Sequence, residues 1–245
     1  MIECENLCKI FSKDTGIRNI NIKFEQGKVY GIVGYNGAGK TTLLRCIEGL
    51  YIPTSGKVYH DGISTTEGEK FLEHRRNIAY LPTDDYLYNK LTCIENIELA
   101  TILRTGKKTI SSTTKELISY LDVANYLDKR FCDCSTGMKK KVQIIISLIG
   151  DVKTLIWDEP NDGLDILTNI KIKKLIKYYK EKNFTILLSS HVVEFLENCI
   201  DFVILMKDGE IIEQLESKDI SSLEELYIKH LNQDIIDMPF HSEVL

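Results

Sequence analysis

The chain has 245 residues, of which 43% are apolar and 27% are charged, and its formal net charge at pH 7 is −5. This length allows one large α/β domain or two small ones, and the negative charge argues against a general affinity for nucleic acid or anionic lipid. The longest apolar stretch, Val142 to Ile149, is far shorter than the roughly 18 residues that a membrane-spanning helix needs. The N-terminal residues do not form a signal peptide.

Strands are predicted first at 2–7 and 20–24, and later at 57–60 and 77–81. Together they predict an antiparallel flank on a core sheet.

A buried strand over 29–33 leads directly into a phosphate-binding loop. Residues 34–42 read GYNGAGKTT, which matches G-x-x-x-x-G-K-[ST], and an apolar helical pattern follows. Such a loop turns its backbone N–H groups toward a polyphosphate, and the helix N-terminus adds a favourable dipole. Lys40 is predicted to reach the β- and γ-phosphates, and the Thr41 hydroxyl to bind Mg²⁺. The residues predicted to contact the nucleotide here are Gly34, Tyr35, Asn36, Gly37, Ala38, Gly39, Lys40, Thr41 and Thr42.

A helical block follows, from about residue 84 to residue 150. Capping boxes predict one helix after Thr92 with Glu95 and another after Thr113 with Glu116, and a third helix is predicted over 135–149. Lys40 and Asp158 are much further apart than one βαβ unit requires, so we interpret the block as an insertion.

The seven cysteines, without a secretion signal, indicate a reducing cytosol and free thiols. Cys132 and Cys134 have no second pair of ligands nearby in the sequence, so we expect neither a metal ion nor a disulfide to depend on them.

The next predicted strand, at 154–157, ends in two adjacent acids, Asp158 and Glu159. Because successive side chains of a strand point to opposite sides, Asp158 is predicted to bind Mg²⁺ while Glu159 polarises a water molecule at the γ-phosphate.

The chain continues with a helix at 165–182, a strand at 184–188, a helix at 191–199 and a helix at 221–231. Alternating strands and helices predict an α/β fold with a parallel core sheet. Five lysines on the 165–182 helix lie opposite its apolar face, which predicts a solvated face: Lys171, Lys173, Lys174, Lys177 and Lys180.

The order of these motifs resembles the ATP-binding subunits of ATP-binding cassette (ABC) transporters over nearly the whole chain. The matching features are the P-loop, the helical insertion, S-x-G at 135–137, D-E-P at 158–160, G-L-D at 163–165 and His191. The forms S-T-G-M-K at 135–139 and L-Y-x-x-L-T at 87–92 resemble the subgroup paired with exporters of drugs, antibiotic peptides or polysaccharides.

The resemblance implies a RecA-like P-loop NTPase core with an antiparallel β flank and an inserted α-helical subdomain. It implies an ATPase domain over 1–220, with a short C-terminal helix and tail over 221–245. It also implies ATP and Mg²⁺, a second ATP-binding subunit in a homodimer or heterodimer, and a separate integral-membrane permease. The subunit would then be cytoplasmic and peripheral on the inner face of the membrane.

Site roles carry over where residues match the family's motifs. Ser135 and Gly137 would contact the γ-phosphate of ATP held by the other subunit, and Asp165 would connect the two sites. His191 would contact the γ-phosphate and help to hold the attacking water near Glu159. Phe11 stands where the family stacks an aromatic ring on adenine, although burial in the sheet flank is an alternative.

Two positions depart from the family pattern. Thr83 and then Asp84 stand where the family has Gln or Glu, so either Asp84 replaces that metal contact or coupling to the permease is weaker. Thr136 replaces the first Gly of the commonest signature, a change that the exporter subgroup tolerates.

Two other functions remain open from the sequence. One is a hydrolysis-deficient nucleotide-binding regulatory subunit of an ABC heterodimer, which the presence of Glu159 and His191 disfavours. The other is a soluble non-transport ABC ATPase, which would predict two cassettes or a long coiled coil.

Overall fold

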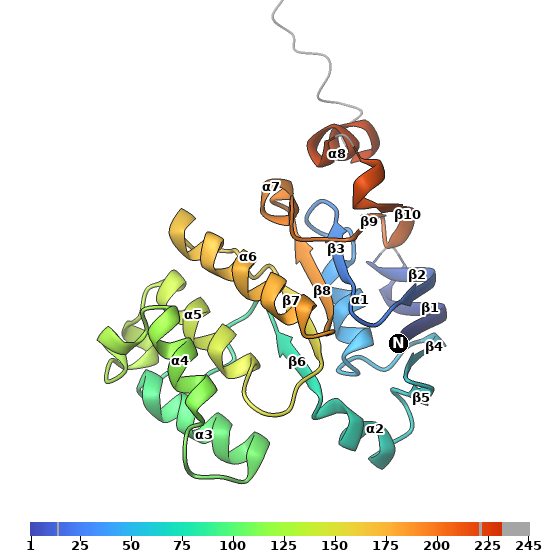
Figure 1. Ribbon diagram of the computed structural model, residues 1–245. Helices are drawn as coiled ribbons and strands as arrows, with labels where there is room; N and C mark the ends of the chain where they lie inside the picture. Colours follow the sequence, from blue (N-terminus) through green and yellow to red (C-terminus); the bar gives the residue numbers. More distant parts are fainter. Residues whose placement is uncertain (14, 221, 232–245) are drawn as a thin grey trace, which may run out of the picture.

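Two sheets make up the β structure of the residues that the structure describes. The computed structural model describes residues 1–13, 15–220 and 222–231 (Figure 1). The smaller sheet has the order β2-β1-β4-β5, is antiparallel, and consists of β1 (Ile2–Ser12), β2 (Thr15–Phe24), β4 (Ser55–His60) and β5 (Ile63–Ser64). The larger has the order β10-β9-β3-β8-β7-β6 and consists of β3 (Val29–Val33), β6 (Ile78–Leu81), β7 (Thr154–Asp158), β8 (Thr185–Ser190), β9 (Phe202–Lys207) and β10 (Glu210–Glu216).

The larger sheet is parallel from β9 to β6, and only β10 runs antiparallel to its neighbour. This confirms the predicted α/β fold. The prediction was wrong for the strand at 77–81, since Ile78–Leu81 pairs in parallel with β7 and belongs to the core sheet. Strands covered on both faces are apolar throughout, so their sequence does not tell which sheet they join.

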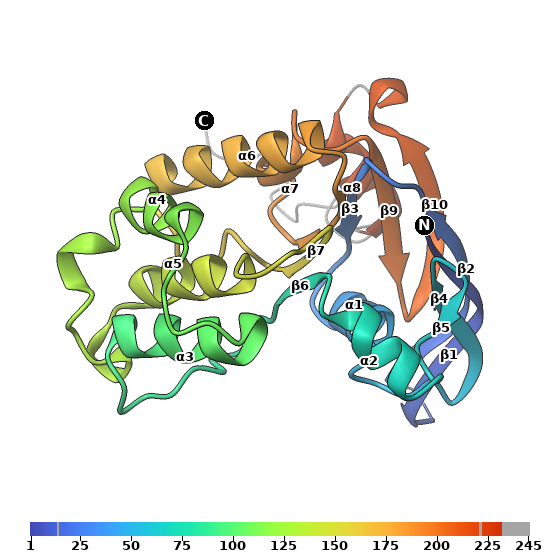
Figure 2. The same ribbon diagram turned by 60° about the horizontal axis from the view of Figure 1, so that its bottom comes forward.

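Eight helices surround the sheets in the described part of the chain. They are α1 (Lys40–Ile47), α2 (Glu69–Arg75), α3 (Cys93–Thr105), α4 (Ser112–Tyr120), α5 (Thr136–Ser147), α6 (Ile166–Glu181), α7 (Val193–Leu196) and α8 (Leu223–Leu231). Figure 2 shows α3, α4 and α5 gathered beyond β6, away from the antiparallel flank. The predicted tail over 232–245 lies outside the described residues.

The predicted helix starts are confirmed in one case and wrong in another. Thr92 and Glu95 form the predicted capping box of α3. α4 starts earlier than predicted, because the Ser111 hydroxyl accepts the Thr114 N–H at 3.1 Å and therefore caps the helix in place of Thr113. α7 is shorter than the predicted 191–199, since the backbone is extended at Glu197 and left-handed at Asn198.

Two apolar clusters cover the two faces of the parallel sheet. Alternation along β3 sends Val29 and Val33 to the cluster that contains the helical block, and Tyr30 and Ile32 to the cluster that contains α1 and the antiparallel flank. α1 is thereby buried between the two sheets. Because the P-loop lies between β3 and α1, this packing fixes both of its ends.

Three of the five α6 lysines have specific partners, so the predicted solvated face was only partly right. Lys171 pairs with Asp122 at 2.5 Å and Lys180 pairs with Asp201 at 2.6 Å. Lys173 donates to the carbonyls of Glu194 at 2.7 Å and Glu197 at 3.2 Å, at the end of α7. Lys174 and Lys177 are exposed as predicted.

Candidate nucleotide-binding and hydrolysis site

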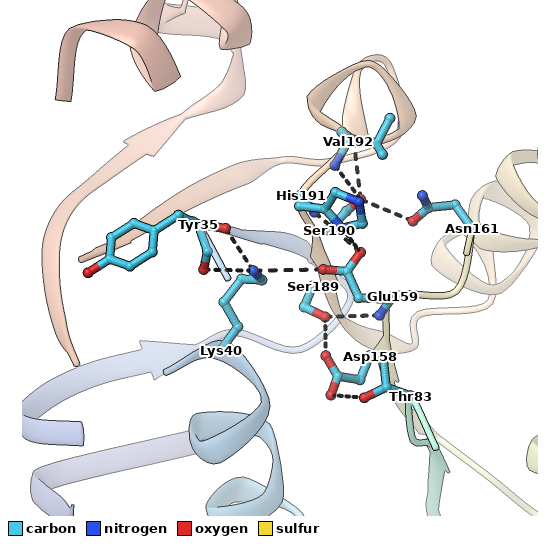
Figure 3. Close-up of polar contacts among 11 residues, drawn as sticks. Tyr35, Lys40, Thr83, Asp158, Glu159, Asn161, Ser189, Ser190, His191 and Val192 are labelled. Carbon is cyan, nitrogen blue, oxygen red and sulfur yellow. Dashed lines mark hydrogen bonds and ion pairs between the residues drawn. The ribbon is translucent and has the colours of Figure 1, made fainter. Parts of the chain in front are cut away.

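The P-loop turns sharply into α1 at Gly39. Its φ of +102° is left-handed, and a Cβ there would lie 2.7 Å from Ile17 Cγ2. Lys40, the first residue of α1, folds back over the loop and donates from Nζ to the Gly34 carbonyl at 2.7 Å and to the Tyr35 carbonyl at 3.4 Å (Figure 3). The ammonium is thereby held at the centre of the loop.

A cavity of about 330 Å³ opens over this loop, within the size range of small-ligand sites. The predicted contacts from Tyr35 to Thr42 all line it, together with Thr83 and Glu159. Sequence reasoning missed Thr15 and Gly16, which also line it from β2. Phe11 is not among the lining residues, and its ring meets Tyr51 edge-on with centroids 5.4 Å apart. The alternative of burial in the sheet flank was wrong, since Phe11 is 52% exposed.

Glu159 lies between the side chains of Lys40 and His191 at the end of β7. Its Oε1 is 3.7 Å from Lys40 Nζ, and its Oε2 is 2.9 Å from His191 Nδ1 and accepts the His191 N–H at 3.3 Å (Figure 3). The glutamate is 8% exposed, whereas the His191 side chain is half exposed. The structure therefore brings together the two residues predicted to be catalytic.

The different directions of Asp158 and Glu159 have another cause than the predicted strand alternation. β7 ends at Asp158, and Glu159 has a left-handed φ of +49°. Its N–H donates to the Ser189 hydroxyl at 3.0 Å and to the Ser189 carbonyl at 3.2 Å, and these bonds hold the strained conformation. The turn, rather than the strand, aims the Glu159 carboxylate at Lys40.

Lys40 is in an electrostatically unusual position. Burial lowers the pKa of its ammonium, and the nearby carboxylates of Glu159 and Asp158 oppose that shift. A cation that is largely removed from water interacts more strongly with an anion than a solvated one does. The geometry therefore suits a highly charged anionic ligand.

Asp158 is fully buried and accepts two hydroxyl hydrogen bonds. Thr83 Oγ1 donates to Oδ2 at 3.1 Å, and the Ser189 hydroxyl donates to Oδ1. Ser189 thus supports both acids, and the sequence reasoning missed it. The signal was present in two consecutive buried serines at the end of β8, directly before His191.

The structure separates Thr83 from Asp84. Thr83 contacts the Asp158 carboxylate, whereas the Asp84 side chain is 78% exposed and pairs with Arg45 Nη2 at 2.8 Å. Of the two residues named as possible metal contacts, Thr83 alone is joined directly to Asp158.

We expect Thr83→Val, which keeps the shape but removes the hydroxyl, to raise the Mg²⁺ concentration for half-maximal ATP hydrolysis roughly tenfold. Groups that orient a metal ligand typically have effects of about this size. Asp84→Asn should leave that concentration unchanged. Magnesium titration of ATPase activity at saturating nucleotide measures this concentration for both variants. A larger effect of Asp84→Asn would indicate that Asp84, rather than Thr83, contacts the metal ion.

Ser135 and Gly137 lie at the N-terminus of α5, apart from the P-loop cavity. The Ser135 hydroxyl accepts the Met138 N–H at 3.3 Å, and a Cβ on Gly137 would lie 2.7 Å from the Gly163 carbonyl oxygen. A second cavity of about 370 Å³ includes both residues with Asp165 and shares no lining residue with the first. Within one chain the two sets of predicted contacts therefore line separate cavities.

The seven cysteines are free thiols in the structure. Cys132 is exposed, and Cys134 is buried with its Sγ 3.5 Å from Cys93 Sγ. Among the residues that the structure describes, no group of three or more His, Cys, Asp or Glu side chains gathers as a metal site.

The P-loop lies between the buried parallel strand β3 and the helix α1, and two acids stand at the end of β7, two strands away from β3 in the sheet. This arrangement defines the class as P-loop nucleotide-binding proteins. The family model described as ABC transporter matches residues 17–162. The chain therefore belongs to the ABC transporter family, as its motifs suggested.

Named relatives cover nearly the whole chain. The lantibiotic transport ATP-binding protein SrtF of Streptococcus pyogenes is 33% identical over 228 residues, which cover 93% of this chain and 96% of SrtF. The bacitracin transport ATP-binding protein BcrA of Enterococcus faecalis is 30% identical, covering 100% of this chain and 78% of BcrA. The dimeric ATP-binding cassette MJ0796 in a post-hydrolysis state with ADP and Pi has a TM-score of 0.79 at 25% identity, covering 88% of this chain and 98% of that one.

None of the helices in the described residues is long and apolar enough to cross a membrane.

Proposed function

We propose that this chain is the ATP-binding and ATP-hydrolysing subunit of an ABC transporter, and that it powers a separate membrane permease which exports its cargo. The observation that carries the proposal is the position of Glu159, between the P-loop Lys40 and His191 and at the wall of the P-loop cavity. The transport names of SrtF and BcrA support the coupling to export.

The residues around the P-loop cavity fit ATP with Mg²⁺. Lys40 and the loop N–H groups would bind the phosphates, while Thr41, Asp158 and Thr83 would hold the metal ion. Oxygen ligands of this kind are those that Mg²⁺ prefers, and Asp158 is already oriented by two hydroxyl groups. Bound there, the ion would neutralise phosphate charge.

Hydrolysis is assigned to Glu159 and His191. Glu159 would accept a proton from the attacking water, and the His191 ring would hold the Glu159 carboxylate and the γ-phosphate in place. The short contact between Glu159 Oε2 and His191 Nδ1 supports this pairing and argues against the hydrolysis-deficient alternative.

Two chains would form each complete site. Ser135 and Gly137 of one subunit would contact the γ-phosphate on the other subunit's P-loop, and Asp165 would join the sites. The dimeric state of MJ0796 and the separation of the two cavities within this chain support a dimer. Phe11 remains the proposed contact for adenine.

The permease would hold this subunit at the inner face of the membrane. The ATPase domain is proposed to cover 1–220, with the helical insertion at about 84–150 and the C-terminal helix and tail at 221–245. Isolation of the chain from membranes, identification of its bound permease and stimulation of ATP hydrolysis by that permease would test the coupling. Full ATPase activity without any membrane partner would favour the soluble alternative.

We expect Ser135→Arg to reduce ATP hydrolysis about a hundredfold while nucleotide binding to the P-loop stays within twofold, since the bulky side chain would stand where the signature must close on the partner's phosphate. A fluorescent ATP analogue and a phosphate-release assay measure the two quantities. Ser111→Arg is the matched control, because Ser111 is also an N-cap serine but lies on α4. Equal losses in both variants would mean that capping, rather than the dimer contact, explains the effect.

A further inference from the structure

Two buried thiols lie in contact at the starts of two helices. Cys93 is the first residue of α3, and Cys134 directly precedes Ser135, the N-cap of α5. The two helices pack side by side in the helical block (Figure 2), and the Sγ atoms of the cysteines are 3.5 Å apart. The expected absence of a disulfide at Cys134 was based on its neighbours in the sequence, whereas Cys93 is 41 residues away.

The two thiols differ in how far a small molecule can reach them. Cys93 is fully buried, whereas Cys134 is 8% exposed. Burial, and then the hydrogen bond with Cys134, raises the pKa of Cys93 well above its ordinary value. Cys93 therefore stays a protonated, weakly nucleophilic thiol at neutral pH, and Cys134 is the one that a small oxidant meets first.

A buried hydroxyl group lies beside the pair. Tyr126 Oη has no hydrogen-bond partner among the residues that the structure describes. Burial raises the pKa of Tyr126, and the nearby Cys93 and Cys134 add to that shift. A phenol hydroxyl is a hydrogen-bond donor, so it is available to an oxygen atom added to one of these sulfurs.

We propose that Cys93 and Cys134 are a redox-active dithiol, which hydrogen peroxide converts to a disulfide that displaces the signature residues Ser135 and Gly137. The Cys134 sulfur attacks the O–O bond and becomes a sulfenic acid, while its proton leaves with the other oxygen as water. The Cys93 sulfur then attacks the Cys134 sulfur, and the sulfenic oxygen takes the Cys93 proton and leaves as a second water. Two thiols are oxidised, and one peroxide is reduced to two waters.

The disulfide changes the geometry next to the signature residues. Bonded sulfur atoms are about 2.0 Å apart, so the two cysteines must approach each other by roughly 1.5 Å. The Cys93 N–H is already held by the Lys129 carbonyl at 3.0 Å. Because Cys134 is joined to Ser135, its movement reaches the residues that would contact the partner's phosphate. This consequence for hydrolysis rests on the proposed function.

Treatment of the whole chain with hydrogen peroxide tests the chemistry. Intact-mass measurement should show the loss of two hydrogen atoms, and a peptide map should place the link between Cys93 and Cys134. ATP hydrolysis should fall about tenfold or more, since displacement of a contact group by about 1 Å can lower turnover strongly. A fluorescent ATP analogue should bind the P-loop within twofold of its former affinity, and dithiothreitol should restore hydrolysis by reducing the disulfide.

Three serine variants distinguish the pair from the other thiols. Cys93→Ser and Cys134→Ser should each keep their hydrolysis rate after peroxide, because neither can form the link. Cys132→Ser is the matched control, since Cys132 is exposed and lies two residues before Cys134. It should form the link and lose hydrolysis as the native chain does. Equal sensitivity of Cys93→Ser and the native chain would mean that another oxidised group is responsible, and would overturn the inference.

Hydrogen exchange separates this inference from the proposed function. The N–H groups of Met138 and Lys139 are bonded to Ser135, so peroxide should speed their exchange in the native chain but not in Cys93→Ser. This measurement needs no ATP. A chain that hydrolyses no ATP before oxidation would contradict the proposed function, while the link and the faster exchange would still support the redox pair. No link after peroxide, or a link without faster exchange, would contradict the redox pair.

Discussion

Glu159→Gln should retain ATP binding while slowing hydrolysis by a factor on the order of a hundred or more, because a positioned base typically contributes about that much. The amide keeps the shape of the side chain and an oxygen that can accept the His191 N–H, but it cannot take a proton. Calorimetry with a nucleotide analogue and a phosphate-release assay separate binding from turnover.

The same variant should run as a dimer with ATP and as a monomer with ADP in size-exclusion chromatography coupled to light scattering. Unhydrolysed ATP would bridge one P-loop and the other chain's signature in the proposed dimer, and it would then stabilise the assembly by mass action. Adding Ser135→Arg should abolish that dimer. Normal hydrolysis by Glu159→Gln would mean that Glu159 is not the catalytic base. A variant that stays monomeric with ATP would indicate that the chain pairs with a different partner chain, or that it is a regulatory subunit.

The second large effect is expected for Lys40. Lys40→Met should lower the affinity for Mg-ATP by a factor on the order of a hundred, since a hydrogen bond to a charged group contributes about 1.5–3 kcal/mol and the ammonium also neutralises phosphate charge. Titration calorimetry measures this affinity.

Thermal unfolding of the same variant gives an independent result. Burial lowers the pKa of Lys40, which means that the charged form pays a desolvation penalty in the folded chain. Methionine keeps most of the side-chain volume and removes that penalty, but it also leaves the buried Glu159 carboxylate without its lysine partner, so the melting temperature of the variant without nucleotide should change little. Unchanged ATP affinity would contradict the site, whereas a large loss of stability would mean that the Lys40 contacts with Gly34 and Glu159 hold the fold itself.

Much of the fold was predictable because its signals are local. The strand 29–33, the P-loop and α1 are adjacent in sequence, and the pattern of glycines, lysine and apolar residues specifies them together. The Thr92 cap of α3 was equally clear, because its partner Glu95 is three residues away. Where two residues offered similar caps, as at Ser111 and Thr113, the choice depended on packing.

The sequence by itself determined that this protein has a phosphate-binding loop, two acids after a buried strand and a signature serine at a helix start. Tertiary structure alone decided how they meet. Glu159 reaches Lys40 because Ser189, from a neighbouring strand, holds a left-handed turn; Thr83 reaches Asp158 only because β6 pairs with β7 in parallel. Contacts between residues tens of positions apart depend on strand order and packing, which no local pattern encodes.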